Sequence, residues 1–238
     1  KVAIRSIIER QRAAGYPVDR AVISWGGDMI EGCYIYGGQN VSGLDRTSNT
    51  HRLVQQIRLV APQMAELAVD VATYVDEVVG GNHGRPNGRN DFADPEDNFD
   101  VMAGWWAADL TTATERIRWH VHDNWWGGFY VSGHYVVSMH GDAWRGPLSQ
   151  LDSLLPQWIT SGEFELKPEV FLTHHRHRML TTDVSGIPLI QGGTIDGGSR
   201  HYLKAHGGSS RAGQHVIIMS ERHVPEAIFP VYFTDRVA

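Results

Sequence analysis

Apolar side chains recur along this chain with two different periods, which separate the expected helices from the expected strands. The helical period of three to four residues marks residues 2–14 and residues 48–75, the second segment with Pro62 as a point where the helix could kink. Residues 95–114 begin with a proline and acidic side chains, which helix starts prefer. Together with residues 147–159, these segments predict four helices.

Short apolar runs bounded by glycine, proline or aspartate predict strands. A hairpin is expected within residues 127–142, folded at Ser132 and Gly133. The other expected strands are residues 21–25, 76–79, 116–123 and 169–177, with further short strands after about residue 178. Helices and strands alternate early in the chain, whereas strands dominate later. This order predicts an α/β fold in which two sheets pack face to face with helices outside.

Composition narrows the class of protein further. The chain has 238 residues, 42% hydrophobic and 20% charged, which is enough for one large domain covering residues 1–238. A formal charge of -6 argues against a long electrostatic track for duplex nucleic acid, although a short anion site is compatible with it. The single cysteine, Cys33, leaves no intrachain disulfide and fits a reducing, cytoplasmic compartment. No run of eighteen apolar residues is present, so no membrane span is expected.

Four apolar runs end in side chains of the kind that bind metals. These side chains are Asp28, Asn82 with His83, His140, and the histidines at 174–177. Ligands of open α/β sheets bind where strands finish at their carboxyl ends, so we expect these groups to form a common site. Taken alone, Asn82 and His83 fit an ordinary turn better than a metal site, and the other strand ends reverse that preference. A carboxylate, an amide and several imidazoles suit Mn, Fe or Zn better than Ca.

The histidine-rich segment THHRH allows a choice of ligands if it is still part of a strand. His175 and His177 are two residues apart, so strand geometry places them on the same face and His174 on the other. We therefore predict His175 and His177 as ligands. His174 is expected to pack in the interior or to support the ligands if the pleat persists, and to be an equally good ligand candidate if the strand end has already lost its pleat.

These residues resemble the ordered motifs of the calcineurin-like metallophosphoesterases. The resemblance covers about residues 20–180 and rests on GGD with the following Glu31, GGNHG, MHG, and HRH at 175–177. It implies a four-layer αββα sandwich of two mixed sheets flanked by helices, holding two divalent metal ions. Manganese is the first expectation for these ions, with iron or zinc as alternatives.

Carried over residue by residue, the resemblance also implies roles. Asp28 would bridge the two ions, and His83 would be the catalytic histidine beside the scissile phosphate, with a metal-bound hydroxide as the nucleophile. The remaining ligands would be Asn82, His140 and His175 at one ion and His177 at the other.

Three departures from the family pattern are visible. The family opens with a strand that ends in Asp-x-His, and we expect this strand just upstream of Lys1, since residues 2–14 resemble the helix that follows it. Gly84 stands where the family usually has an acidic residue that orients the catalytic histidine. His174 replaces the glycine of the family's last motif.

The substrate is expected to be a phosphate ester. Arg85 and Arg145 lie within five residues of a predicted ligand and are candidates for contacting phosphate. Seven of the eight tryptophans fall between residues 105 and 158, where they could stack on bases, pack in the core or form a homodimer surface.

The resemblance favours a phosphodiesterase acting on DNA, similar to the Mre11 and SbcD type repair exonucleases and phage-encoded relatives. The alternatives are a phosphomonoesterase, a phosphodiesterase for small nucleotides, or a module of the same fold that has no catalytic activity.

Overall fold

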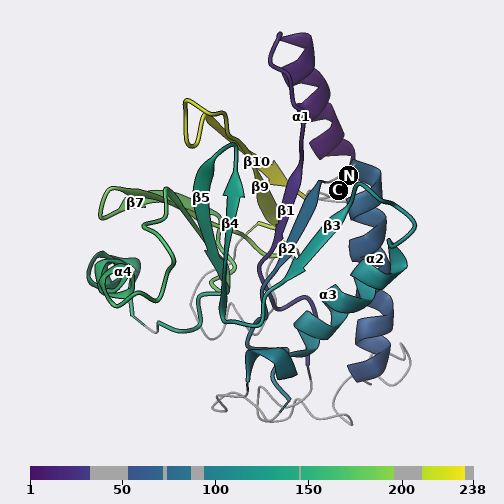
Figure 1. Cartoon of the computed structure of the whole chain (residues 1–238), viewed down its shortest axis with the longest axis horizontal. Helices are drawn as coiled ribbons and strands as arrows, with labels where there is room; N and C mark the ends of the chain where they lie inside the picture. The colour runs from purple at the N-terminus through teal and green to yellow at the C-terminus, as the bar shows by residue number, and fades with distance from the viewer. Residues whose placement is uncertain (33–52, 72–73, 87–93, 145, 196–210, 234–238) are drawn as a thin grey trace. The chain divides into compact units, whose positions relative to one another are not determined.

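A computed structural model describes residues 1–32, 53–71, 74–86, 94–144, 146–195 and 211–233 (Figure 1). The chain has a mixed α/β fold with helices and several sheets. It divides into two compact units, Lys1–Gly127 and Gly128–Ala238, which are considered separately below.

The first unit is built on a three-stranded parallel sheet. Its strands are β1 (Val22–Trp25), β2 (Val75–Val78) and β3 (Arg118–Val121), in that order across the sheet. The unit also contains three α-helices: α1 (Val2–Ala13), α2 (Leu53–Val71) and α3 (Phe99–Leu110). These strands and helices confirm the alternation of helix and strand that the sequence predicts, and α2 contains Pro62.

The core of the first unit lies between the sheet and helices α2 and α3, which run side by side in Figure 1. Val78 is fully buried at the end of the central strand, and Trp25, Trp119 and Val121 pack against the same cluster. The helical members of the cluster are Ile57, Ala61, Met64, Ala65, Ala103 and Ala107. The four alanines among them let the two helices pack closely.

The segment 95–114 differs from the single helix that the sequence predicts. It forms a 3-10 turn, η1 (Pro95–Asp97), followed by α3. Asn98 separates them because its backbone is extended and its side chain accepts the N–H of Asp100, at 2.9 Å, as a helix cap.

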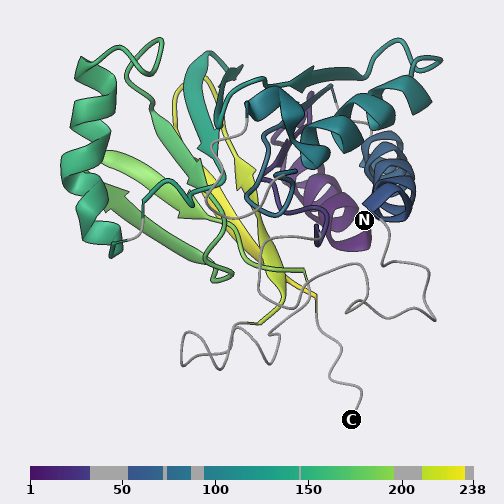
Figure 2. The same cartoon turned by 90° about the horizontal axis from the view of Figure 1, so that it is seen from below.

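The second unit contains a five-stranded sheet and a two-stranded antiparallel sheet. The larger sheet has the order β4 (Trp126–Val131), β5 (His134–Met139), β6 (Val170–Thr173), β8 (Ile187–Gln191) and β7 (Leu180–Val184). The smaller sheet pairs β9 (Gly213–Ile218) with β10 (Ala227–Tyr232). Figure 2 shows helix α4 (Leu151–Thr160), which follows the short turn η2 (Leu148–Gln150), beside the larger sheet.

The predicted hairpin is confirmed at β4 and β5. Ser132 and Gly133 both have positive φ, 51° and 85°, which is the conformation of the two-residue turn that matches strand twist. The neighbouring strands β5, β6 and β8 are parallel and largely buried, with Met139, Phe171 and Leu189 at 0% exposure.

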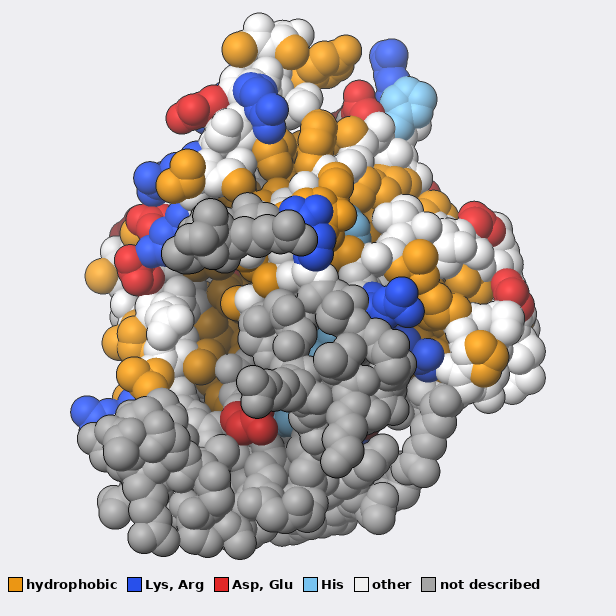
Figure 3. Space-filling view, turned by 180° about the vertical axis from the view of Figure 1, so that it is seen from behind, with side chains coloured by type: hydrophobic (Ala, Val, Ile, Leu, Met, Phe, Trp, Pro, Cys, Tyr) orange, Lys and Arg blue, Asp and Glu red, His pale blue; other side chains and the backbone are white. Residues whose placement is uncertain are grey.

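The tryptophans divide between surface and core. Trp105 and Trp106 on α3 are 47% and 38% exposed, whereas Trp144 in the second unit is 3% exposed. Exposed hydrophobic side chains lie among charged ones on the face drawn in Figure 3. Of the helices in the described part of the chain, none combines the length and apolar composition needed to cross a bilayer.

An ion pair ties the start of β5 to the segment before β6. His134 Nδ1 lies 2.8 Å from Glu169 Oε2, and His134 Nε2 lies 3.0 Å from the carbonyl oxygen of Ser220. The hydrogen bond to Glu169 raises the pKa of His134, and the same bond lowers the pKa of Glu169. The histidine contribution to stability is complete below pH 6.5 and is lost as pH rises through the raised pKa. The Glu169 contribution is present above pH 4.5 and is lost as pH falls through the lowered pKa.

We therefore predict that the substitution His134→Gln destabilises the protein most between pH 4.5 and 6.5. Because Glu169 is half exposed, the expected loss is small, on the order of 0.5 kcal/mol. Urea unfolding of both proteins at pH 5.5 and pH 9 measures it, with the exposed His223→Gln as control. A loss that is larger at pH 9 than at pH 5.5 would contradict the assignment.

Candidate metal centre

In the first unit, two glycine-rich turns lie in direct backbone contact at the carboxyl ends of β1 and β2. A Cβ atom on Gly81 would lie 2.3 Å from both the backbone nitrogen and Oδ1 of Asp28, and one on Gly27 would lie 2.5 Å from the nitrogen of Gly81. No side chain fits at either position. The glycines of GGD and GGNH therefore allow Asp28 and the Asn82–His83 pair to follow neighbouring strands at close range.

The predicted catalytic histidine contacts the predicted bridging carboxylate. The backbone N–H of His83 donates to Asp28 Oδ1 at 2.8 Å, and His83 Nε2 lies 3.8 Å from Asp28 Oδ2. Asn82 is 5% exposed and lies between this contact and the end of β2. The first unit thus brings Asp28, Asn82 and His83 together, as the strand-end pattern predicts.

Glu31 contacts the other nitrogen of the His83 ring. His83 Nδ1 lies 2.8 Å from the carbonyl oxygen of Glu31 and 3.9 Å from its Oε2. Since a carbonyl oxygen only accepts hydrogen bonds, Nδ1 must carry a proton, which leaves Nε2 of the neutral ring with its lone pair. Glu31 therefore orients His83, although Gly84 lacks the acidic side chain that the family resemblance leads one to expect.

Asp100 is a residue of this region that sequence reasoning missed. Its side chain is 0% exposed and accepts four backbone N–H groups, from Asp28, Met29, Ile30 and Gly81, at 2.8 to 3.2 Å. The carboxylate thus holds the turn after β1 against the turn after β2. An aspartate at the start of α3 could be noticed in the sequence as a helix-start residue, but its partners are backbone groups that no motif reveals.

In the second unit, the ends of two parallel strands bring histidines together. His140 follows β5 directly and is 2% exposed, and its carbonyl oxygen accepts the N–H of His174 at 3.0 Å. His140 Nε2 lies 3.1 Å from His175 Nδ1. His140 and His175 therefore meet, as predicted.

The reasoning that paired His175 with His177 on one strand face is wrong. Strand β6 ends at Thr173, and His175 and His177 have positive φ, 62° and 55°, which no pleated strand has. These side chains are placed by a tight loop and not by strand alternation. The role of His177 as a ligand stays a prediction.

Predicted ligands account for most of the unusual backbone in the described part of the chain. Five non-glycine residues there have positive φ, and Asp28, His175 and His177 are three of them. A left-handed conformation costs a non-glycine residue roughly 1–2 kcal/mol, less for Asp and His than for bulkier types. Such residues persist where surrounding contacts hold them, and they often occur at functional sites.

The spacing of two donor atoms within the second unit fits a divalent cation. A metal-bound imidazole nitrogen lies about 2.0–2.1 Å from the ion, so two neighbouring ligand nitrogens come within roughly 3–3.5 Å of each other. The 3.1 Å between His140 Nε2 and His175 Nδ1 matches that separation. Asp28 and Asn82 are the candidate oxygen donors of the first unit.

Arg85 and Arg145 are the arginines that the sequence predicts to contact phosphate. Arg85 lies at the turn after His83, where its backbone N–H approaches the carbonyl oxygen of Asn82 at 3.5 Å. Arg145 lies outside the described residues. Arg176 Nη2 donates to the carbonyl oxygens of Gly146 and Trp144, at 2.5 and 3.4 Å, so this arginine links the loop after β5 to the loop after β6.

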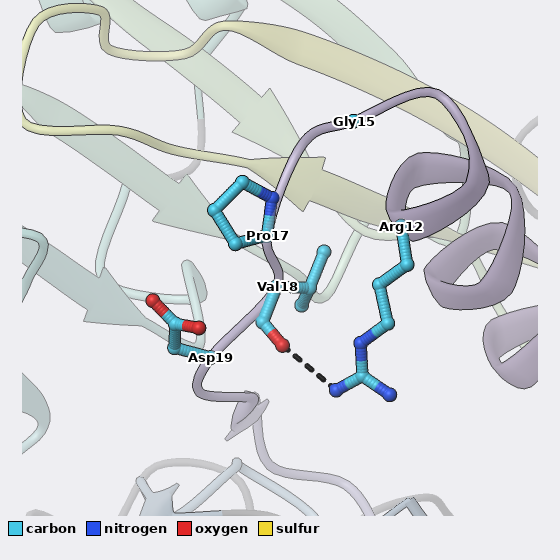
Figure 4. A pocket seen from close by; sticks show the side chains of 5 residues that line it. All are labelled: Arg12, Gly15, Pro17, Val18 and Asp19. Atoms are coloured by element: carbon cyan, nitrogen blue, oxygen red, sulfur yellow. Dashed lines mark hydrogen bonds between the residues drawn. The ribbon is translucent and has the colours of Figure 1, made fainter.

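A separate open pocket of about 520 Å³ lies at the end of α1 (Figure 4). It is lined by Arg12, Gly15, Pro17, Val18 and Asp19, and Arg12 donates to the carbonyl oxygen of Val18 at 2.8 Å. None of the predicted ligands lines this pocket.

Comparisons with known proteins give distant structural similarities. No family model matches the chain, and no curated protein matches it. A hypothetical protein from Pyrococcus horikoshii has a TM-score of 0.48 at 11% identity, over 97% of this chain and 81% of that one. A novel archaeal phosphodiesterase has 0.46 at 12%, over 97% and 91%. Vps29 from Entamoeba histolytica, complexed with zinc, has 0.40 at 12%, over 90% and 98%. At such scores these similarities assign neither a family nor an activity.

The hydrogen bonds of Arg176 to two loop carbonyls should stabilise the folded protein. We expect Arg176→Ala to destabilise the protein by about 1.5–3 kcal/mol, because it removes charge-assisted hydrogen bonds to two loop carbonyls. The control is Arg178→Ala, an exposed side chain on the same loop, which should stay within about 0.5 kcal/mol of the parent protein. Chemical denaturation measures both. Equal stability of the two variants would show that Arg176 does not hold the loops.

Proposed function

We propose that this protein is a metal-dependent phosphoesterase. The observation that carries the proposal is the placement of ligand-type side chains at the carboxyl ends of parallel strands in both units, with Asp28 contacting His83 in one and His140 contacting His175 in the other. The order of these residues in the chain is that of the calcineurin-like metallophosphoesterases. We propose that both groups bind divalent ions, with Asn82 as a further ligand in the first unit and His177 as a further ligand in the second.

Two bound cations would supply Lewis-acid stabilisation of the phosphoryl oxygens and make a water molecule acidic enough to attack at neutral pH. His83 would act on the leaving group. Its Nδ1 proton is held by the carbonyl oxygen of Glu31, so Nε2 is the ring atom left to act. As a general acid the ring would take up a second proton at Nε2 and pass it to the leaving oxygen. Arg85, two residues further along, would contact the phosphate.

The finer proposal is a phosphodiesterase that acts on DNA. It is supported by the likeness of the motif GNHGR to the nuclease branch of the family. The net charge of -6 supports a second candidate, a phosphatase or phosphodiesterase for small substrates, because duplex binding ordinarily requires massed Lys and Arg. A module without catalytic activity is the third candidate.

A substrate panel separates these candidates. The full-length protein with Mn²⁺ is assayed on single-stranded DNA, double-stranded DNA, a generic phosphodiester and a phosphomonoester. Cleavage of DNA and of the phosphodiester is expected. Hydrolysis of the monoester with DNA left intact would reject the nuclease, and no hydrolysis of any substrate would favour the module without catalytic activity.

Substitutions at two residues test their assigned roles. Asp28→Ala should abolish both metal binding and turnover, because it removes the bridging carboxylate. His83→Ala should leave metal binding unchanged and lower kcat by about 10²–10⁴-fold, the usual contribution of a general acid. Isothermal titration with Mn²⁺ and steady-state kinetics measure the two effects, with exposed Asp123→Asn as control. The reverse pattern would overturn the roles.

A further inference from the structure

The side chain of Asp100 has more backbone partners than a helix-start residue needs. Oδ2 accepts the N–H groups of Asp28 and Gly81, at 2.8 and 3.0 Å. Oδ1 accepts those of Met29 and Ile30, at 3.0 and 3.2 Å. Its own N–H is held by the side chain of Asn98. The residue lies in the first turn of α3, where the helix dipole favours a negative charge.

Through these bonds Asp100 contacts the backbone of the residues that form the candidate centre. It holds the backbone of Asp28, and the carboxylate of Asp28 in turn accepts the N–H of His83. It also holds Gly81, whose chain leads directly into Asn82 and His83. A single carboxylate therefore sets the spacing between the turn that carries Asp28 and the turn that carries His83.

Asn98 completes this arrangement by filling the space beside Gly84. A Cβ atom on residue 84 would lie 2.0 Å from Asn98 Oδ1 and 3.0 Å from the nitrogen of Asp100. Asn98 also donates from Nδ2 to the carbonyl oxygen of Gly81, at 2.8 Å. The room that a side chain at position 84 would need is thus occupied by Asn98 and the start of α3.

We infer that Asp100 is a positioning residue for the metal centre, an inference that rests on the proposed function. Asn98 and the start of α3 fill the space that the acidic side chain expected at position 84 would need, and Glu31 contacts the His83 ring in its place. The negative charge of Asp100 lies at the start of α3 and acts through the backbone of the two glycine-rich turns, without touching substrate or metal. Groups of this kind behind metal ligands commonly contribute 10- to 100-fold in metal affinity.

The substitution Asp100→Asn tests the inference with little change in shape. An amide group replaces one acceptor oxygen, so an NH₂ donor would face two backbone N–H donors. We expect the dissociation constant for Co²⁺ to rise by about 10- to 100-fold and the visible absorption of the bound cobalt to change. Hydrogen exchange at residues 28–30 and 81 should become faster. Asp109→Asn, at the exposed far end of the same helix, is the matched control and should leave all three readouts unchanged.

The outcomes separate this inference from the proposed function. If the parent protein binds no Co²⁺, the proposed metal centre is wrong. If it binds Co²⁺ and a folded Asp100→Asn variant binds with the same affinity and spectrum, Asp100 is not a positioning residue. Should that variant fail to fold, Gly84→Ala replaces it, since its Cβ would displace Asn98 and with it the start of α3. Unchanged cobalt binding in that variant would equally overturn the inference.

Discussion

A buried carboxylate bonded to four backbone N–H groups is the constraint on which the candidate centre of the first unit depends. The turns after β1 and β2 contain glycines because their backbones are in contact. Glycine-rich segments have little conformational preference of their own. Buried N–H groups without partners would each cost free energy. The carboxylate of Asp100 accepts hydrogen bonds from these N–H groups. The same hydrogen bonds offset the free-energy cost of burying its negative charge. The two turns therefore have one favourable arrangement, and Asp28 and His83 are held in it.

In the second unit, two loops are also held together by one charged side chain, but its charge is positive. There the loops after β5 and β6 present carbonyl oxygens, and the guanidinium of Arg176 donates to those of Trp144 and Gly146 while lying 5.2 Å from the centroid of the Trp144 ring. In the first unit a carboxylate accepts hydrogen bonds from backbone N–H groups, and in the second a guanidinium donates hydrogen bonds to backbone carbonyl oxygens. In both units the charged side chain forms hydrogen bonds with backbone atoms. These bonds restrict the conformation of the loops that carry the ligand-type side chains. This is the kind of preorganisation that binding sites require.

The sequence predicts the elements better than the contacts between them. Hydrophobic periodicity identifies α1 and the β4–β5 hairpin, because each has a local signal in the spacing or in Ser132 and Gly133. It fails where a side chain overrides the pattern, as when Asn98 caps α3 and divides the expected helix. Strand alternation also fails as a guide to His175 and His177, because strand β6 ends at Thr173. Asp100 could not be found, since it lies 72 positions from Asp28 and bonds only to backbone.

The left-handed backbone at Asp28 and His175 connects this local geometry to the proposed chemistry. Each conformation costs free energy. The backbone N–H of Asp28 is held by Asp100, and the side chain of His175 contacts His140. The two imidazole nitrogens of His140 and His175, 3.1 Å apart, can be satisfied by one shared proton or by one cation, but not by two lone pairs facing each other. A cation held by both nitrogens would take the place of this hydrogen bond, so the loops after β5 and β6 already hold the two imidazoles at a spacing that either contact requires.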